Sequence, residues 1–530
     1  MKEKKTRPEK PKNIVLCSDG TGNSANKNRG TNVFKLYEAV DRVNPKVSQF
    51  AYYDDGVGTS RLKPLMILGG AFGFGLGRNV RQLYTQLVQT YNPGDRIYLF
   101  GFSRGAFTVR ELAGLINACG VLDRELTGDY ANLRRHVKIA YRLYRSGARS
   151  FLGSLAYYFL VLPIEWMVLL VFPKYRPKTT AEAFRRAYGV KLNARDREGR
   201  VPIAFLGCWD TVGAIGGPID GMVKAYDRAL YRSSFSNYCL SACVERARHA
   251  LSLDDERQTF HPLMWNEAKE KKDRIKQVWF AGVHGNVGGG YPKQGMSLVA
   301  LKWMMDEAFA AGLRFIAHDR TLFASHADVH DKLYDSRSGW QVYYRYKPRN
   351  VHKICKDFGI APKIHESVLD RIVSSTDGYA PGNLPRRLTL IRDRRPARQL
   401  AKATKVINAE IGDRGSLLDD WWIRVWVWWR RLAHLLFLVA SLALLLYVIR
   451  GENTLTGVVE ALKSLGSLSG LTAAVIKLAK EPWVLILLVV TYFYGVVGKA
   501  SMTDRFYRFW FRLRKTLAEI KAGTQGAGKG

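Results

Sequence analysis

The sequence contains few cysteines for its length, and none of them has the spacing of a metal ligand set. Its 530 residues include six cysteines, at positions 17, 119, 208, 239, 243 and 355, without a C-x-x-C pair. This distribution argues against a disulfide framework and a zinc site, and it is typical of a reducing compartment. The opening residues, MKEKKTRPEKPKN, lack an apolar segment. We therefore expect no secretory signal peptide and interpret residues 1–12 as a basic tail.

Acidic residues are also scarce. Asp and Glu number 46 against 82 Lys and Arg, which gives a formal net charge of +36. A charge of this size indicates an anionic partner, either nucleic acid or an anionic membrane surface. No nucleic-acid-binding motif is present, and the basic residues gather around apolar segments. We therefore expect the anionic leaflet of a membrane, and not nucleic acid, to be the partner.

Residues 97–117 carry a motif for nucleophilic catalysis. The apolar run 97–100 predicts a buried strand, and Gly-Phe-Ser-Arg-Gly and a helical pattern follow it. This order is typical of a nucleophile elbow, in which a serine on a sharp strand-to-helix turn exposes its hydroxyl. Ser103 is the candidate nucleophile, and Gly101 and Gly105 leave room where strand and helix nearly touch. A purely structural glycine turn is the alternative.

An acid and a histidine follow two further predicted strands. The apolar run 201–208 ends just before Asp210, and the run 278–281 is followed closely by His284. An acid at such a strand end can orient a histidine and stabilise its charged form. The chain order serine, acid, histidine is the order of α/β hydrolases. Taken singly, either residue is more often a cap or a loop residue.

The first predicted strand, 13–18, leads into a turn that is a candidate for oxyanion binding. Asp19-Gly20-Thr21-Gly22 follows that strand. In α/β hydrolases the residue after the serine supplies one oxyanion N–H, and an early loop supplies the other. Arg104, Gly20 and Thr21 are therefore the candidate backbone donors. An ordinary Asp-Gly turn explains the early loop equally well.

Other acids and histidines are weaker candidates. His249 and His261 flank the acidic stretch 254–257, and Asp54 and Asp55 lie in an early loop. These groups could line a pocket or hold a cation, but structural ion pairs are the simpler interpretation. We expect no metal and no cofactor.

Four stretches together resemble one known family. They are CSDGTGN, YNPGDRIYLFGFSRGAF, FLGCWDTVGAIG and VWFAGVHGNVGGGY, with further agreement in ALSLDDERQTFHP and IHESVLDRI. They are similar to the α/β-hydrolase family of uncharacterised function that includes the type VI secretion phospholipase effectors. The resemblance covers roughly residues 13–390. It implies an α/β fold with a doubly wound, mostly parallel sheet, and an esterase or lipase triad of serine, aspartate and histidine.

A long apolar run interrupts this catalytic region. Residues 151–172 could span a bilayer by length, but both flanks are basic and Pro163 splits the run into two short arms. The segment 151–178 is therefore predicted to be a membrane-associating insertion, either a re-entrant or interfacial hairpin or a lid. Burial in an enlarged soluble core is the alternative.

Beyond residue 390 the composition changes. Residues 391–430 form a basic and aromatic connector that contains five tryptophans between 421 and 429. Two apolar runs, 432–449 and 482–498, predict two transmembrane helices within 431–499, and a basic tail fills 500–530. A buried core helix is the alternative for either run. Basic residues precede the first run and follow the second, so we expect an integral protein of a bacterial inner membrane with its catalytic domain in the cytoplasm.

The sequence thus predicts a membrane-anchored serine hydrolase that cleaves a carboxylic ester. A lipid ester is the expected substrate, which makes the protein lipase- or phospholipase-like. The alternative is a membrane scaffold or pore-forming protein that uses the hydrolase fold as a binding module. Association into a homo-oligomer stays open.

Overall fold

A single parallel sheet forms the centre of the molecule in the computed structural model. The structure describes residues 11–20, 30–55, 76–146, 181–190, 200–213, 238–268, 270–271, 273–391, 396–412, 415–449 and 482–523. Eight strands are hydrogen-bonded in the order β2-β1-β3-β4-β5-β6-β7-β8, and every neighbouring pair is parallel. Their bounds are β1 Asn13–Ser18, β2 Gln49–Asp54, β3 Arg96–Phe102, β4 Ile203–Trp209, β5 Ala247–Ser252, β6 Ile275–Phe280, β7 Lys363–His365 and β8 Thr389–Ile391.

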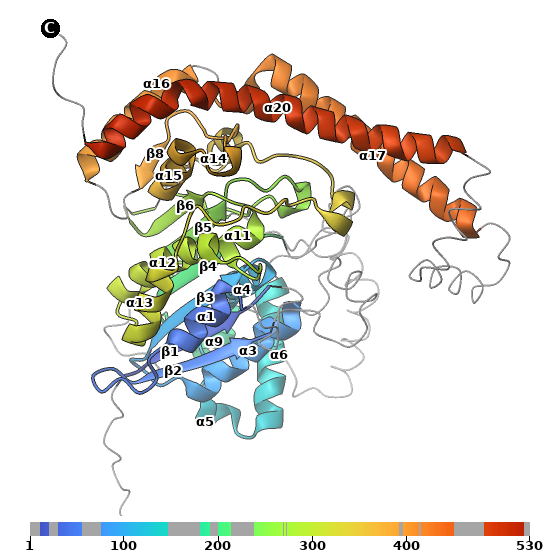
Figure 1. The fold of residues 1–530 in the computed structure, drawn as a ribbon. Coiled ribbons are helices and arrows are strands. Elements are labelled where there is room, and N and C mark those ends of the chain that lie inside the picture. The colour runs from blue at the N-terminus through green and yellow to red at the C-terminus, as the bar shows by residue number, and fades with distance from the viewer. Residues whose placement is uncertain are drawn as a thin grey trace, which may run out of the picture.

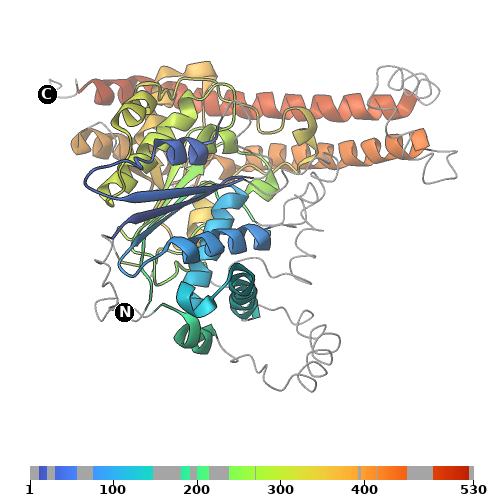
Figure 2. The same cartoon turned by 90° about the horizontal axis from the view of Figure 1, so that it is seen from below.

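Helices cover both faces of the sheet (Figures 1 and 2). One face carries α3 (Leu76–Thr90), α4 (Arg104–Cys119), α6 (Tyr130–Ser146) and α9 (Ala181–Tyr188), and the other carries α1 (Asn32–Ala39) and α12 (Gly295–Ala310). The strands are buried on both faces, because alternate side chains enter opposite cores. Ile14, Leu16, Ile97 and Leu99 belong to the first core, and Val15, Cys17, Tyr98 and Phe100 to the second. The predicted doubly wound α/β class is confirmed.

The strand order reverses beside β1, which lies between β2 and β3. In doubly wound sheets such a switch point opens a crevice outside the carboxyl ends of the strands, and ligands bind there. The loops after β1, β3, β4 and β6 all start from this edge. They contain the residues that the sequence singles out for catalysis.

A third core joins the end of the sheet to the C-terminal helices. It contains side chains of α14 (Val351–Asp357), α15 (Glu366–Ser374), α16 (Ala397–Ile411), α17 (Trp421–Ile449) and α20 (Pro482–Ala522). The segment after residue 500, interpreted from sequence as a basic tail, continues α20 as far as Ala522. Likewise, the basic stretch after residue 390 contains α16, which buries Leu400, Ala403, Ile407 and Ile411.

The helices α17 and α20 pack side by side as a hairpin that extends beyond the body of the molecule (Figures 1 and 2). Each is long and apolar enough to cross a membrane, by length and composition, within Trp421–Ala443 and Ile486–Ala522. We call residues 421–431 and 499–522 the basal part of this hairpin, and residues 432–449 and 482–498 its distal part. The predicted insertion 151–178 lies outside the described residues.

Smaller elements complete the description. They are α5 (Arg124–Thr127), α11 (His284–Gly288), α13 (Ala317–Ser325) and the 3-10 helices η4 (Gln258–Phe260), η5 (Gly339–Tyr343), η6 (Thr376–Gly378) and η8 (Leu417–Asp419). Of these, α11 and η4 are in contact through His284 and Phe260, and Gln341 of η5 accepts a hydrogen bond from Arg257, the residue before η4.

Candidate active site

Ser103 lies on a strained turn between β3 and α4. Its backbone has φ 58° and ψ −123°, a conformation that costs a non-glycine residue about 1–3 kcal/mol. The turn is tight on both sides: a Cβ on Gly101 would lie 2.5 Å from the Gly105 carbonyl oxygen, and one on Gly105 would lie 2.1 Å from that of Ser18. These contacts give the physical reason for glycine at both positions. Among the residues that the structure describes, the Ser103 hydroxyl has no hydrogen-bond partner.

Asp210 and His284 meet over the same edge of the sheet. Asp210 directly follows β4, His284 is the first residue of α11, and His284 Nδ1 lies 2.6 Å from Asp210 Oδ2. The loop that carries His284 packs on the serine turn: the Phe102 and His284 ring centroids are 4.6 Å apart. A Cβ on Gly288 would lie 1.9 Å from the Phe102 ring. The structure therefore brings the three predicted residues to one place.

Arg349 is a partner of Asp210 that sequence reasoning missed. Its Nη1 and Nη2 lie 2.7 and 2.8 Å from the two Asp210 oxygens, and both side chains are fully buried. The backbone N–H and hydroxyl of Ser252 donate to the same carboxylate, each at 3.0 Å. Burial by itself would raise the pKa of Asp210, but the Arg349 guanidinium and the hydrogen bond from His284 outweigh it and hold that pKa well below its usual range.

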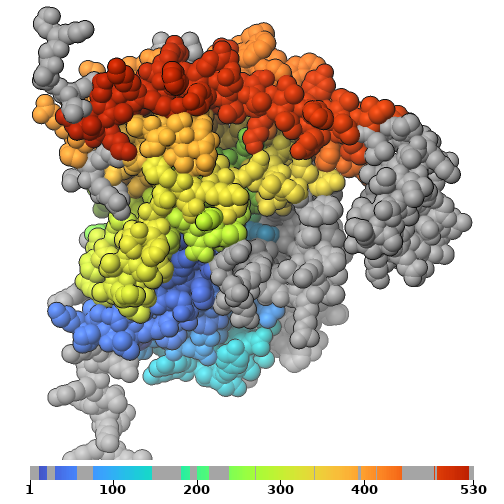
Figure 3. Space-filling view, viewed as in Figure 1, coloured from blue at the N-terminus to red at the C-terminus, as the bar shows by residue number. Residues whose placement is uncertain are grey.

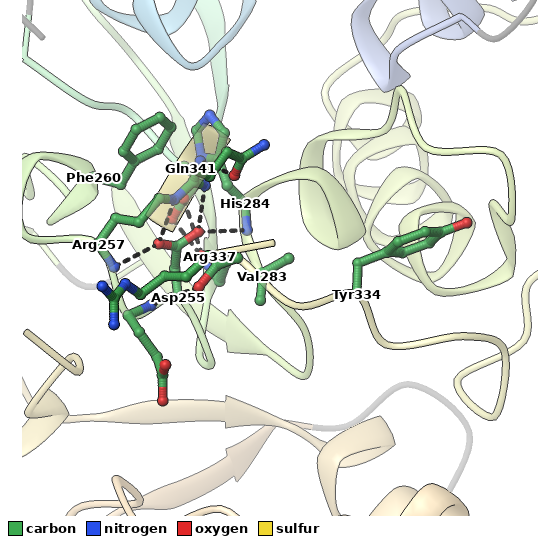
Figure 4. Close-up of polar contacts among 12 residues, drawn as sticks. Asp255, Arg257, Phe260, Val283, His284, Tyr334, Arg337 and Gln341 are labelled. Atoms are coloured by element: carbon green, nitrogen blue, oxygen red, sulfur yellow. Dashed lines mark hydrogen bonds and ion pairs between the residues drawn. The ribbon is translucent and has the colours of Figure 1, made fainter. Parts of the chain in front are cut away.

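A second buried ion pair fixes the backbone of His284. Asp255 Oδ2 accepts the His284 backbone N–H at 3.2 Å and pairs with Arg257 Nη2 at 2.6 Å. Figure 4 shows Asp255 between Arg257 and His284, with Phe260 beside them. The Phe260 ring stands edge-on to the His284 imidazole, with centroids 5.0 Å apart. Burial lowers the pKa of His284, and the hydrogen bond and charge of Asp210 act in the opposite direction.

A model of the type VI secretion system phospholipase effector Tle1-like catalytic domain matches residues 12–307. The chain belongs to this family. Membership supports a hydrolase of the lipase or phospholipase type. The matched range begins just before β1 and ends within α12, so it contains Ser103, Asp210 and His284.

Two further proteins are similar to this Tle1-like chain. An uncharacterized protein of Saccharomyces cerevisiae, YEL023C, is 29% identical over 265 residues, which are 48% of this chain and 32% of the yeast protein. The chain thus spans about a third of the length of the curated relative it matches. A crystal structure of an uncharacterized protein from Pseudomonas aeruginosa aligns with 98% of this chain and 68% of its own, at 16% identity and a TM-score of 0.32.

The candidate oxyanion donors of the Tle1-like domain lie at the turns after β1 and β3. Arg104 begins α4, whose N-terminus supplies a positive dipole end beside Ser103. The Gly20 N–H is donated to Asp19 Oδ1 at 2.6 Å. Asp19 is itself held by the Tyr53 hydroxyl at 2.7 Å and the Thr31 hydroxyl at 2.5 Å. Thr21 lies outside the described residues.

The remaining acids and histidines have structural partners. His249 Nε2 lies 3.1 Å from the Thr211 N–H, and His261 Nε2 lies 2.9 Å from the Lys347 carbonyl oxygen. Burial lowers the pKa of these two histidines to about 3 and about 4. Asp254 accepts the Gly282 N–H at 2.6 Å. Within the described part of the chain, no group of three His, Cys, Asp or Glu could hold a metal ion.

Asp54 lies at the end of β2, next to the first turn. The Ser18 hydroxyl lies 3.4 Å from its Oδ2, and burial raises the pKa of Asp54 to about 7. Its neighbour Asp55 ends the described segment. The structure therefore places this pair at the first turn of the sheet edge and gives Asp54 a structural contact to β1.

Proposed function

We propose that this chain is a serine hydrolase that cleaves a carboxylic ester of a membrane lipid. Ser103 acts as nucleophile, His284 as general base and acid, and Asp210 as the group that orients His284. The proposal rests on one observation: the 2.6 Å contact between Asp210 and His284 lies beside a strained serine turn. Membership of a phospholipase effector family supports the substrate class.

The hydrogen bonds of Asp210 support one assignment of the protons on His284. An ionised carboxylate can only accept hydrogen bonds, so in the neutral imidazole His284 Nδ1 donates to Asp210 and Nε2 is left as the acceptor. Nε2 then takes the Ser103 proton as the serine oxygen attacks the ester carbonyl, and later returns it to the leaving alcohol. Water then hydrolyses the acyl-enzyme. His284 takes a proton from the attacking water and returns it to the Ser103 oxygen.

Charge on the carbonyl oxygen develops next to the N-terminus of α4. The Arg104 N–H and the 20–21 turn are the proposed donors, with the helix dipole adding to their field. In this arrangement the Gly20 N–H exchanges its bond to Asp19 for one to the oxyanion. Loss of one such donor lowers kcat by about 100- to 1,000-fold in related chemistry.

The distal hairpin is proposed to be the membrane anchor. Its apolar side chains are turned outward: Ile486, Phe493 and Val497 are 60%, 61% and 50% exposed. Only 22% and 17% of the most apolar windows of α17 and α20 are buried, which does not fit a core helix. Figure 3 shows α20 as a continuous exposed surface along one side of the molecule. Lipid would cover the distal part of this surface, residues 482–498.

The flanking charges give the proposed orientation. Arg430 and Arg431 precede the distal part on α17, and Lys499 follows it on α20. By the positive-inside rule these residues and the catalytic domain lie on the cytoplasmic side, as in a bacterial inner membrane. The substrate is then a glycerophospholipid or similar ester of the leaflet that faces the domain.

Phospholipid hydrolysis tests this function. Full-length protein in phospholipid vesicles should release fatty acid, and Ser103→Ala should lose at least 1,000-fold in rate, an effect on the order of that in other triads. Ser325→Ala, which changes an exposed serine on α13, is the matched control and should keep full activity. Undiminished hydrolysis by Ser103→Ala would overturn the assignment.

A further inference from the structure

A pocket lies at the base of the hairpin, away from the candidate active site. Its volume is about 500 Å³, and it opens between the start of α17 and the middle of α20. No residue that lines it belongs to the candidate active site. Its function therefore has to follow from its own walls and from its position.

Basic and apolar side chains line the pocket, together with the carboxylate of Asp420. Arg505, Arg508 and Arg512 lie on one face of α20, because positions three and seven apart share a face. The pocket also has an apolar lining, to which Phe509 and the 64% exposed Phe511 contribute. A pocket with cationic and apolar sides fits an amphiphile with an anionic head.

Two of the three arginines have a carboxylate partner, and neither pair is buried. Arg505 Nη2 lies 3.4 Å from Asp420 Oδ2. Arg508 pairs with Asp504 one turn earlier, with both side chains largely in water, and such pairs contribute little. Arg512 forms no ion pair with any residue in the described ranges. The three arginines can therefore still bind a phosphate, which an arginine holds with two parallel hydrogen bonds.

The pocket lies beyond the end of the apolar distal part, on the side of the catalytic domain. Gly498 packs closely on Arg430, since a Cβ on Gly498 would lie 2.8 Å from the arginine side chain. The apolar segments of α17 and α20 therefore end side by side. Arg505, Arg508 and Arg512 lie seven, ten and fourteen residues further along α20 than Gly498, about 10, 15 and 21 Å at 1.5 Å per residue, so Arg505 is the arginine nearest the bilayer. Side chains of a helix lean toward its N-terminus, which here is the membrane side, so Arg508 and Arg512 extend back toward the interface.

We propose that this pocket binds the phosphate head group of an anionic glycerophospholipid from the leaflet that faces the catalytic domain. The arginines hold the phosphate, and Phe509 and Phe511 contact the apolar part of the bound lipid. The inference rests on the proposed membrane anchoring, but it is independent of the proposed catalysis. It adds a lipid site to the protein that is separate from the ester-cleaving centre.

Lipid retention tests the pocket. Full-length protein carrying Ser103→Ala, which prevents hydrolysis, is reconstituted in phosphatidylcholine vesicles with a minor fraction of phosphatidylglycerol and floated on a density gradient. Lipids retained after mild detergent extraction are then counted by native mass spectrometry. Phosphatidylglycerol should be retained in preference to phosphatidylcholine, and excess inorganic phosphate should not displace it.

Charge removal supplies the matched comparison. Arg508→Gln with Arg512→Gln should weaken phosphatidylglycerol retention by roughly 30-fold, since each basic side chain near an anionic leaflet contributes roughly a five-fold factor. Both residues are exposed, so the fold should persist. The control, Arg398→Gln with Lys402→Gln, removes two exposed charges at the same spacing from α16 and should change nothing.

Three results would overturn the inference. Equal phosphatidylglycerol retention by the Arg508/Arg512 variant, or displacement by inorganic phosphate, would overturn the lipid site alone. Failure of the Ser103→Ala protein with all its arginines intact to float would overturn the membrane anchoring and this inference with it. None of these results touches the Ser103 assignment, which vesicle hydrolysis tests separately.

Discussion

The distal and basal parts of the α17–α20 hairpin differ in what covers their apolar side chains. In the distal part, Val489 and Phe493 are 54% and 61% exposed. In the basal part of the same helix, Trp510 and Leu517 are fully buried in the core that also contains α15 and α16. One continuous helix therefore has two environments. The basal part packs against the core of the catalytic domain, whereas the distal part keeps its apolar side chains exposed.

The basal part of the hairpin also contacts the loop that lies next to His284. Arg430 of the basal part lies 3.5 Å from Glu256, and the neighbouring Asp255 holds the His284 backbone. Two adjacent residues of one loop thus connect the hairpin and the histidine. Insertion of the distal part would fix the position of the catalytic crevice relative to the bilayer.

The largest expected effect comes from charging the distal part. Ile486→Asp, Val489→Asp, Phe493→Asp and Val497→Asp together should remove the protein from floated vesicles. An Asp at the centre of a membrane helix costs about 2.5–3.5 kcal/mol on insertion scales, and four of them exceed what the apolar residues contribute. Hydrolysis of a soluble short-chain ester should persist. Continued flotation of this variant would show that the distal part is not the anchor.

The next effect is on the basal part and on folding. Trp510→Ala should lower the free energy of unfolding by about 3–5 kcal/mol, because a large buried side chain is lost. Its Nε1 also donates to the Pro381 carbonyl oxygen at 2.8 Å. Chemical denaturation in detergent measures the change. The adjacent Phe511→Ala, on the exposed side, should stay within about 0.5 kcal/mol of the unmodified protein; equal losses would refute the contrast between the two faces.

The contrast within α20 was only partly predictable from sequence. The apolar run 482–498 is visible as a span, but the basic residues after 500 hide a second pattern. Buried side chains recur there with helical spacing, at Phe506, Phe509, Trp510, Leu513, Leu517 and Ile520. That spacing is the available signal for the helix beyond residue 500. The packing partner of this stripe lies in distant segments, which local periodicity does not identify.

The sheet and the candidate site were likewise only partly predictable from the sequence. The apolar runs of β1, β3 and β4 are recognisable, whereas β5 carries two buried polar residues, Arg248 and His249. Their hydrogen-bond partners include Glu307 and Thr211. Ser103, with its flanking glycines, is recognisable because an elbow is a local pattern. Arg349 has no such local signal, since it reaches Asp210 from 139 residues away.

A smaller effect concerns the pH dependence of the catalytic domain, away from the hairpin. Activity needs neutral His284, whose pKa burial lowers, so the acid limb of kcat/KM should lie below the ordinary histidine value of roughly 6.5. Arg349→Gln leaves the Asp210 charge uncompensated, which favours protonated His284. The limb should therefore move to higher pH by about one unit. Arg349→Lys keeps the positive charge, so the acid limb should return most of the way to its position in the unmodified protein.

This prediction also separates a positioning role from a purely structural one. A structural loss would lower the rate at every pH without moving the limb. A limb that stays in place or moves to lower pH in Arg349→Gln would contradict the proposed electrostatic role. The four Asp substitutions of the distal part, assayed on the soluble ester, should leave the limb unchanged.

The smallest effect is the coupling between the two regions. Glu256→Gln and Arg430→Gln each break the contact between the active-site loop and the hairpin. A double-mutant cycle on unfolding free energy should give a coupling of about 1 kcal/mol, because the pair is partly buried. A coupling of zero would mean that the hairpin and the loop are energetically independent.

The central claim is that Ser103 is the reacting nucleophile, and covalent labelling tests it most directly. Full-length protein in vesicles is treated with a fluorophosphonate, and the modified peptide is identified by mass spectrometry. We predict one adduct, on Ser103, that disappears in Ser103→Ala and forms much more slowly in His284→Ala, where the general base is missing. An adduct on another residue, or equal labelling of Ser103→Ala, would contradict the account.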